Sequence, residues 1–231
     1  MCHGAPISAF PEAKLGAPFG AQVHGYSYGD VGDKRIAILP DIYGCNPFYQ
    51  GMAAHFLNKG ARVDLIDPFH GLGELPEITR EAAFARRNKV QDKTFLDAFG
   101  AYVSEAGVTG VIGFCLGGLY IFELARRGLP AGLVGLYGFP QGLPNDDPID
   151  PPFTYLSSIK QPFVMLMGRD DEPVGRDNID KLEAAASSAP AMSLTVYEGV
   201  GHNFLPLLDS DAPEKRALAE DAMRQCEETL L

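Results

Sequence analysis

The sequence has few cysteines, an excess of acidic over basic residues and no long hydrophobic run. Its four cysteines are scattered over 231 residues and form no C-x-x-C pair, so neither a zinc site nor a thioredoxin-type motif is indicated. The apolar run around Cys115 is too short and too rich in glycine to span a bilayer. The N-terminal residues MCHGAPISAF lack the basic start and apolar stretch of a signal peptide. We therefore expect a cytoplasmic protein whose thiols stay reduced.

The charge balance restricts the partners. With 19 Lys and Arg against 30 Asp and Glu, the formal net charge is -11, which argues against nucleic acid or an anionic membrane surface as a partner. An anionic substrate would need local Arg or Lys. Cys2 and His3 are adjacent, but two residues cannot form a metal site, and a flexible terminus is the expected state. No metal or organic cofactor is implied.

Strand and helix patterns alternate along the chain. Expected strands cover residues 21–28, 34–39, 61–66, 108–112, 131–137, 162–167 and 192–197. Expected helices cover residues 48–58, 78–90, 91–107, 116–127, 178–188 and 213–230. Such alternation predicts an α/β fold with a doubly wound, mostly parallel sheet and helices on both faces. The length suits a single domain over residues 1–231, present as a monomer or a small homo-oligomer.

The most specific motif is a glycine-rich junction between an expected strand and an expected helix. Residues 113–118, GFCLGG, match the G-x-nucleophile-x-G pattern of a nucleophile elbow, with Cys115 in the place of the usual serine. The N-terminal dipole of the helix would favour the thiolate. The backbone N–H of Leu116 would point at a developing oxyanion. A buried structural cysteine in a glycine-rich turn is the alternative interpretation of this pentad.

Catalytic groups of a parallel sheet gather at the carboxyl ends of its strands. Cys115, Asp171 and His202 each follow an expected strand, and the order nucleophile, acid, histidine is that of the α/β hydrolases. His202 would take the thiol proton, and a carboxylate would orient and stabilise the imidazole. Asp170 is a second candidate acid. The spacing G-x-x-D-x-x-V of residues 168–174 favours Asp171.

Over essentially the whole chain, the sequence resembles the dienelactone hydrolase family, also called carboxymethylenebutenolidases, which are single-domain α/β hydrolases with a cysteine nucleophile. Four segments carry the resemblance: 40–44 (PDIYG), 113–118 (GFCLGG), 168–174 (GRDDEPV) and 201–204 (GHNF). It implies a triad of Cys115, Asp171 and His202. It also implies an oxyanion hole formed by the N–H groups of Ile42 and Leu116.

The loop 40–44 departs from the family type at its acid. The family has a Glu there, which is hydrogen-bonded to the resting thiol and can activate it. Asp41 is one methylene shorter, which leaves open whether it makes the same contact. Asp41 and the aromatic residue of this loop, Tyr43, are both expected among the residues that bind the substrate.

Substrate recognition carries over in part. Arg80 matches the first of two family Arg residues that bind the substrate's carboxylate, and Phe84 replaces a nearby Tyr. Tyr137 matches an aromatic residue that lines the pocket. The second Arg is missing, because Leu-Pro stands at residues 205–206 and would make the rim more apolar. Arg87 could replace the lost charge, although a solvated helix face is the favoured interpretation of Arg86 and Arg87.

Three functions are compatible with these residues. The first is a cysteine hydrolase that opens a lactone or cleaves an activated ester through an acyl-enzyme. The second is a carboxylesterase or thioesterase with a different substrate range and the same triad. The third is a non-catalytic binding or thiol-redox protein on the same fold, which the intact triad order argues against. The expected partner of the first two is a small-molecule ester or lactone.

Overall fold

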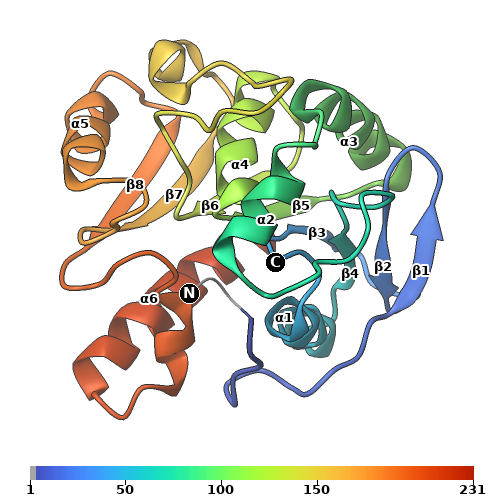
Figure 1. Cartoon of the computed structure of the whole chain (residues 1–231). Helices are drawn as coiled ribbons and strands as arrows, with labels where there is room; N and C mark the ends of the chain where they lie inside the picture. Colours follow the sequence, from blue (N-terminus) through green and yellow to red (C-terminus); the bar gives the residue numbers. More distant parts are fainter. Residues whose placement is uncertain (1–3) are drawn as a thin grey trace.

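The computed structural model describes residues 4–231, so Cys2 and His3 lie outside the described part. One eight-stranded sheet, in the order β1-β2-β4-β3-β5-β6-β7-β8, crosses the molecule (Figure 1). Its strands are β1 (Ala17–Gly20), β2 (His24–Tyr28), β3 (Arg35–Leu39), β4 (Arg62–Ile66), β5 (Gly110–Phe114), β6 (Gly132–Leu136), β7 (Phe163–Gly168) and β8 (Met192–Tyr197). From β4 to β8 neighbouring strands are parallel, whereas β1–β2 and β2–β4 are antiparallel.

Helices cover both faces of the sheet. They are α1 (Pro47–Asn58), α2 (Arg80–Arg87), α3 (Asp92–Ala106), α4 (Leu116–Arg126), α5 (Arg176–Ala186) and α6 (Pro213–Leu230). In Figure 1, α1 and α6 lie below the sheet, and α3, α4 and α5 lie above it. Short 3-10 turns occur at Pro152–Thr154, Leu156–Ser158 and Leu205–Asp209. The predicted α/β-hydrolase fold, mostly parallel and covered on both faces, is confirmed.

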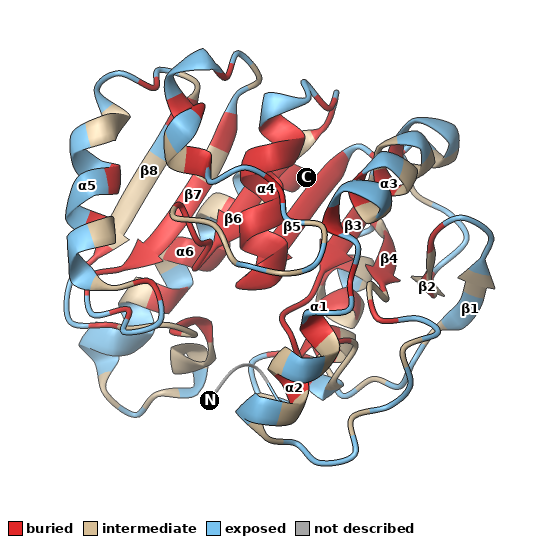
Figure 2. Cartoon of the chain, turned by 45° about the horizontal axis from the view of Figure 1, so that its top comes forward, coloured by how far each residue is buried: buried red, intermediate tan, exposed pale blue. Residues whose placement is uncertain are grey.

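The two cores follow from the alternation of side chains along each strand. In β3, Ile36 and Ile38 belong to the core between the sheet and helices α1 and α6. Ala37 and Leu39 belong to the core on the other face, between the sheet and helices α3, α4 and α5. Figure 2 shows the buried residues concentrated in the middle strands and in α4. Strands buried on both faces are apolar throughout, which explains the continuous hydrophobic runs in the sequence.

The sheet changes winding direction beside β3. After β3 the chain crosses to β4 on one side, and it later returns to β5 on the other side. The carboxyl ends of β3 and β5 therefore flank a topological switch point, where loops of a parallel sheet leave room for a ligand. Both the loop 40–44 and Cys115 lie at this point.

The N-terminal strand prediction was wrong in two respects. Residues 17–20, which lie outside the expected strands, form β1, an exposed strand that pairs with β2. The expected strand 21–28 is shortened to β2, which lies inside the sheet between β1 and β4. The short, Pro- and Gly-containing β1 has no clear periodicity because most of its residues face solvent.

Other boundaries moved little, and β8 and α6 have the predicted residues. The expected helix 78–90 is shortened to α2, because Thr79 caps it by accepting the N–H of Ala82 at 3.2 Å. Within residues 4–231, no helix combines the length and apolarity that crossing a membrane requires.

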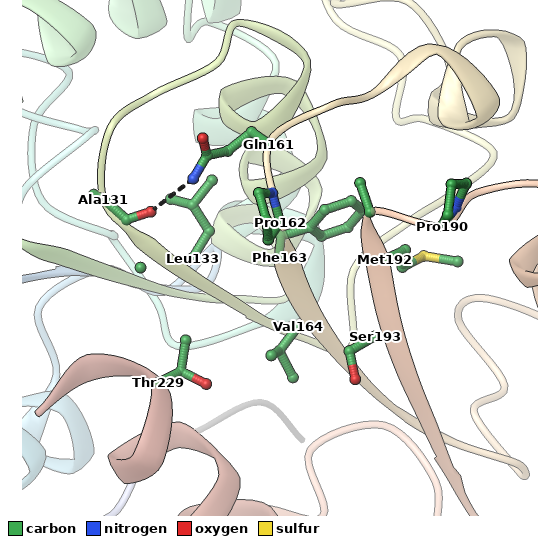
Figure 3. Close-up of a pocket in the computed structure, with 12 residues that line it drawn as sticks. Ala131, Leu133, Gln161, Pro162, Phe163, Val164, Pro190, Met192, Ser193 and Thr229 are labelled. Carbon is green, nitrogen blue, oxygen red and sulfur yellow. Dashed lines mark hydrogen bonds between the residues drawn. The ribbon is translucent and has the colours of Figure 1, made fainter.

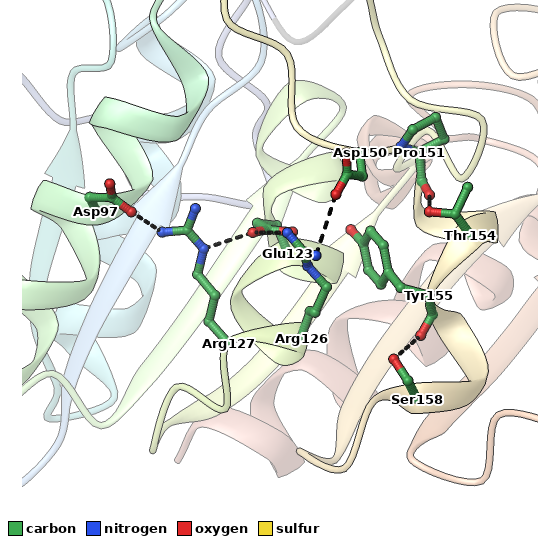
Figure 4. A network of polar contacts seen from close by, with 9 residues as sticks. All are labelled: Asp97, Glu123, Arg126, Arg127, Asp150, Pro151, Thr154, Tyr155 and Ser158. Carbon is green, nitrogen blue, oxygen red and sulfur yellow. Dashed lines mark hydrogen bonds and ion pairs between the residues drawn. The ribbon is translucent and has the colours of Figure 1, made fainter.

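An ion-pair network fixes the C-terminal end of α4 (Figure 4). The Glu123 side chain is 1 % exposed and accepts hydrogen bonds from Arg126 Nε at 2.7 Å and from Arg127 Nε at 2.8 Å. Arg127 also reaches Asp97 of α3 at 2.6 Å, and Arg126 reaches Asp150 at 3.4 Å. The network thus ties the helix that follows Cys115 to two neighbouring segments.

Candidate active site

Cys115 stands between β5 and α4 with φ 55°, in the left-handed region that non-glycine residues rarely adopt. Two glycines make this turn possible. A Cβ on Gly113 would lie 2.2 Å from the carbonyl oxygen of Gly117, and a Cβ on Gly117 would lie 2.2 Å from that of Leu39. The strained turn with its close backbone approach is the geometry that the elbow motif predicts.

The Cys115 side chain borders a cavity of about 720 Å³ at the carboxyl ends of the strands. The residues that line it come from the loop after β3, from the α2 region, from the elbow and from the loops after β6, β7 and β8: Ile42, Tyr43, Ile78, Arg80, Phe84, Cys115, Phe139, Asp170, Glu172, Pro173, Gly201 and His202. Cys115 is 3 % exposed. The structure therefore brings the predicted nucleophile and the predicted base to one cavity.

His202 pairs with Asp171. Its Nδ1 lies 2.8 Å from Asp171 Oδ2, and the other carboxylate oxygen accepts the N–H of Val174 at 3.0 Å. The carboxylate is fully buried, whereas Asp170 is 54 % exposed and lies 3.4 Å from Arg176. Of the two adjacent acids, the structure thus places Asp171 against the imidazole.

The loop after β3 forms a tight turn. The N–H of Gly44 donates to the Asp41 carbonyl at 3.1 Å, and Gly44 has φ 81°. Asp41 is fully buried, and its Oδ1 accepts the N–H of Tyr43 at 2.8 Å. Ile42 and Tyr43, the two central residues of the turn, line the cavity. The turn therefore places Ile42 on the same cavity as Cys115, which an oxyanion donor at this position requires.

Leu116 opens α4 directly after Cys115. The first N–H groups of a helix have no partner within the helix. This N–H is therefore suited to receive an anion at the elbow, and the positive end of the helix dipole adds to the attraction.

The predicted substrate residues divide into two groups. Arg80, Tyr43 and Phe84 line the cavity, with the Arg80 guanidinium 5.5 Å from the centre of the Phe84 ring. Asp41 and Tyr137 are fully buried and are not among the residues that line the cavity. Direct contact of these two residues with a substrate stays a prediction.

Tyr137 supports the histidine loop from behind. Its ring lies 5.4 Å from that of His202 and 5.0 Å from that of Phe204, and its hydroxyl accepts the N–H of Leu205 at 2.9 Å. Burial raises the pKa of Tyr137 well above its ordinary value, so the hydroxyl stays protonated. The family resemblance in sequence does not distinguish an aromatic ring that lines the cavity from one that packs behind His202.

Leu205 and Pro206 do not form the cavity rim. Leu205 is fully buried in the core beneath α6, and neither residue is among those that line the cavity. After His202 the chain passes through Asn203 and Phe204 into the 3-10 turn Leu205–Asp209. The expectation that these residues make the rim more apolar was wrong.

Arg87 cannot replace the missing cavity Arg. It is 1 % exposed and donates to Asp92 at 2.7 Å, and the other Asp92 oxygen accepts from Tyr120 at 2.5 Å. Desolvation raises the pKa of Asp92, and the charge of Arg87 opposes this effect. A solvated face is therefore the wrong interpretation of Arg87, which instead connects α2 with α3 and α4.

Arg86 does not lie on a solvated helix face either, because its side chain contacts Ile42 and Phe69. Its Nη2 donates to the Ile42 carbonyl at 3.1 Å, and its guanidinium lies 4.2 Å from the centre of the Phe69 ring. Burial lowers the pKa of Arg86, and the negative charge of Asp67 opposes this effect. Sequence reasoning missed this contact, because nothing local relates residue 86 to residue 42.

A second pocket, of about 530 Å³, lies at the amino ends of β6, β7 and β8 (Figure 3). None of the residues that line it is titratable, and the polar side chains among them are Gln161, Ser193 and Thr229. The lining therefore offers no general acid or base that could activate the hydroxyl of Ser193 or Thr229. Within residues 4–231, no cluster of three or more His, Cys, Asp or Glu is placed to hold a metal ion.

The chain is similar to known proteins over most of its length. The model of the dienelactone hydrolase family matches residues 23–230. The chain belongs to this family. It is 41 % identical to carboxymethylenebutenolidase 2 of Cupriavidus pinatubonensis, an alignment that covers 100 % of this chain and 99 % of the relative. It is 33 % identical to carboxymethylenebutenolidase of Rhodococcus opacus, over 88 % of this chain and 82 % of the relative.

A solved structure supports the fold. The putative dienelactone hydrolase from Klebsiella pneumoniae superposes with a TM-score of 0.76 at 17 % identity, covering 94 % of this chain and 96 % of that one. The family prediction is confirmed, and so is the prediction of a hydrolase that acts on carboxylic ester bonds.

Proposed function

We propose that the protein opens lactones, or cleaves activated esters, through a thioester acyl-enzyme on Cys115. One observation carries this proposal: Cys115 and His202 border the same cavity, and a fully buried carboxylate lies 2.8 Å from the imidazole. A structural cysteine in a glycine-rich turn would require neither the cavity nor the paired histidine. The names of the relatives, carboxymethylenebutenolidases, support a lactone as the substrate.

The first half of the reaction acylates the thiol. His202 accepts the proton of Cys115, and Asp171 stabilises the resulting imidazolium. The thiolate sulfur bonds to the carbonyl carbon, and the N–H groups of Ile42 and Leu116 stabilise the oxyanion. The carbon–oxygen bond of the ester then breaks, and the leaving oxygen takes the proton from His202. In a lactone, this oxygen stays attached to the acyl chain.

The second half releases the product. His202 removes a proton from a water molecule, whose oxygen attacks the thioester carbon. The same oxyanion donors stabilise the second tetrahedral intermediate. The carbon–sulfur bond breaks, the carboxylic acid leaves and His202 returns the proton to sulfur. Enol lactones and aryl esters suit this chemistry, because their enolate or phenolate leaving groups depart readily.

The polarity of the cavity favours a substrate with one negative charge at most. Arg80 is the single Arg or Lys among the residues that line it, and Asp170 and Glu172 also line it. A carboxylate on the substrate would bind Arg80 through charge-assisted hydrogen bonds. The apolar part of the substrate would contact Phe84 and Phe139, which line the same cavity.

A carboxylesterase or thioesterase with the same triad is the second candidate. The observation that favours it is the lack of a second cavity Arg, since Arg87 is buried against Asp92 and the segment after His202 carries none. With one Arg, the cavity discriminates less strongly in favour of carboxylate-bearing lactones. Neutral aryl esters and acyl thioesters would then be turned over with comparable efficiency.

A substrate panel tests the proposal. We would measure kcat/KM for dienelactones, for other lactones, for p-nitrophenyl esters and for acyl thioesters with the wild type and with Cys115→Ala. We expect a preference for lactones and total dependence on Cys115. A preference for thioesters or simple esters would favour the second candidate. Wild-type turnover by Cys115→Ala would refute the acyl-enzyme mechanism for both.

A further inference from the structure

Arg86 makes a contact that the triad mechanism does not use. It is the seventh residue of α2, whose first turn sends Arg80 into the cavity. A separation of six residues places the two side chains on different sides of a helix. Arg86 points to the turn after β3, donates from Nη2 to the Ile42 carbonyl at 3.1 Å and lies over the Phe69 ring.

The Ile42 carbonyl belongs to the central peptide of the turn Asp41–Gly44. Gly44 N–H closes this turn on the Asp41 carbonyl, so the peptide between Ile42 and Tyr43 is its middle link. The common types of β-turn, I and II, differ mainly in the orientation of this link. Arg86 donates a hydrogen bond to the carbonyl of this peptide. The N–H of the same peptide, which belongs to Tyr43, donates to Asp41 Oδ1 at 2.8 Å.

Both ends of the central peptide are therefore held by side chains, one from α2 and one from the turn itself. The peptide on the other side of Ile42 is held through the Asp41 carbonyl. With both flanking peptides fixed, the backbone dihedrals of Ile42 are fixed as well. A trans peptide directs its N–H opposite its carbonyl, so the Gly44 contact also sets where the Ile42 N–H points.

We propose that Arg86 is a positioning residue, which holds the turn so that the Ile42 N–H meets the oxyanion at Cys115. The inference rests on the proposed function, in which Ile42 is an oxyanion donor. Arg86 does not line the cavity and touches no reacting atom. It acts through Ile42 and Tyr43, both of which do line the cavity.

The same contact links substrate binding to the oxyanion hole. Arg80 and Phe84 lie in the cavity on α2, and Arg86 extends from the same helix to the turn. Binding of a carboxylate at Arg80 restrains α2, and a restrained α2 keeps Arg86 on the Ile42 carbonyl. When Arg86 is replaced, kcat should therefore fall more for anionic substrates than for neutral esters. The difference between the two substrate classes should appear in kcat rather than in KM.

Two reactions of the Cys115 thiol distinguish a positioning role of Arg86 from other roles of this residue. Acylation by a p-nitrophenyl ester passes through an oxyanion, whereas alkylation by iodoacetamide does not. We would compare Arg86→Met, which removes every donor, with Arg86→Lys, which keeps a charged donor. Lys89→Met is the matched control, because Lys89 is an exposed cation just after the same helix. Thermal unfolding would be recorded for each variant.

We expect Arg86→Met to slow acylation about 10- to 100-fold, since it acts on one of the two oxyanion donors and loss of a donor costs about 10²–10³. Alkylation should stay within about threefold of the wild type. Arg86→Lys should recover at least half of the loss on a logarithmic scale, and Lys89→Met should behave as the wild type. The kcat for an anionic lactone should fall further than that for the neutral ester.

Three results would overturn the inference. One is acylation by Arg86→Met at the wild-type rate. Another is an equal fall of acylation and alkylation, which would mean that Arg86 acts on the thiol itself. The third is a lowered melting temperature with no recovery in Arg86→Lys, which would mean a purely structural role. Failure of the proposed function is recognised separately, as unchanged turnover by Cys115→Ala.

Discussion

Replacing Asp171 with Asn removes one negative charge and changes little in shape. The carboxylate is fully buried, and its Oδ2 lies 2.8 Å from His202 Nδ1. When His202 accepts the thiol proton, a positive charge forms next to it. At a charge separation of about 4 Å and an effective dielectric constant of about 20, the attraction is about 4 kcal/mol. Its loss corresponds to about three decades in rate.

The neighbouring acid supplies a matched control. Asp170 carries the same charge, also lines the cavity and is 54 % exposed, and its carboxylate lies 3.4 Å from Arg176. We expect kcat/KM of Asp170→Asn for a neutral p-nitrophenyl ester to stay within about threefold of the wild type, because solvent screens an exposed charge. The assay is initial-rate kinetics at several pH values, with thermal unfolding to verify that each variant is folded.

A kcat/KM of Asp171→Asn within tenfold of the wild type would refute this reasoning, because the loss of a buried carboxylate next to a forming imidazolium should slow the reaction far more. Equal losses in the two variants would also refute it, since the general negative potential of the loop would then matter more than the specific contact.

Three further predictions follow from the structure. Iodoacetamide should label Cys115 at pH 7 to 8 and abolish activity, whereas Cys45 and Cys226 should stay unlabelled until the pH is well above 9, because burial raises the pKa of both thiols. Arg80→Ala should lower kcat/KM about tenfold for an anionic lactone and leave a neutral ester nearly unchanged, as paired kinetics would show. Glu123→Gln should lower the free energy of unfolding by about 2–4 kcal/mol, measured by urea denaturation, with kcat per folded molecule unchanged.

Each of these has a clear contrary outcome. Labelling of all three thiols at one rate would mean that the elbow gives Cys115 no special reactivity. Equal losses on both substrates in Arg80→Ala would make Arg80 structural. For Glu123 the control is Glu228→Gln, whose carboxylate is 62 % exposed in its pair with Arg224 and should contribute less than about 0.5 kcal/mol. Equal effects of the two Glu variants would contradict the importance of burial.

The parts of the site that the sequence predicts are those encoded by neighbouring residues. The elbow needs small residues at fixed offsets from Cys115, because any Cβ at Gly113 or Gly117 would collide with backbone. The acid loop places Asp171 three residues before the N–H of Val174 that it binds. Such short-range constraints appear as spacings, so the turn at Cys115 and the pairing of His202 with Asp171 could be predicted from the sequence.

The other features depend on packing between distant segments. Arg86 meets Ile42 across 44 residues, and no periodicity relates them. Arg87 lies seven residues from Arg80, on the same side of α2, yet only Arg87 is covered by α3 and α4. Tyr137 follows a buried strand with φ 54°, which turns its ring behind His202 instead of into the cavity. Local patterns cannot show which side of a helix or turn a neighbour covers.

The position of α2 has a consequence for protein engineering. Residues 67–91 join β4 to α3 without adding a strand, so a homologous segment could be exchanged while every sheet pairing is kept. An exchanged segment that introduced new cavity side chains but no hydrogen-bond donor at position 86 would remove the hydrogen bond that the Ile42 carbonyl now accepts from Arg86. A chimera with altered specificity would then be a slow catalyst, and the fault would lie outside the pocket that was redesigned. Substrate-range libraries in this segment should therefore vary positions 78, 80 and 84 and hold position 86 constant.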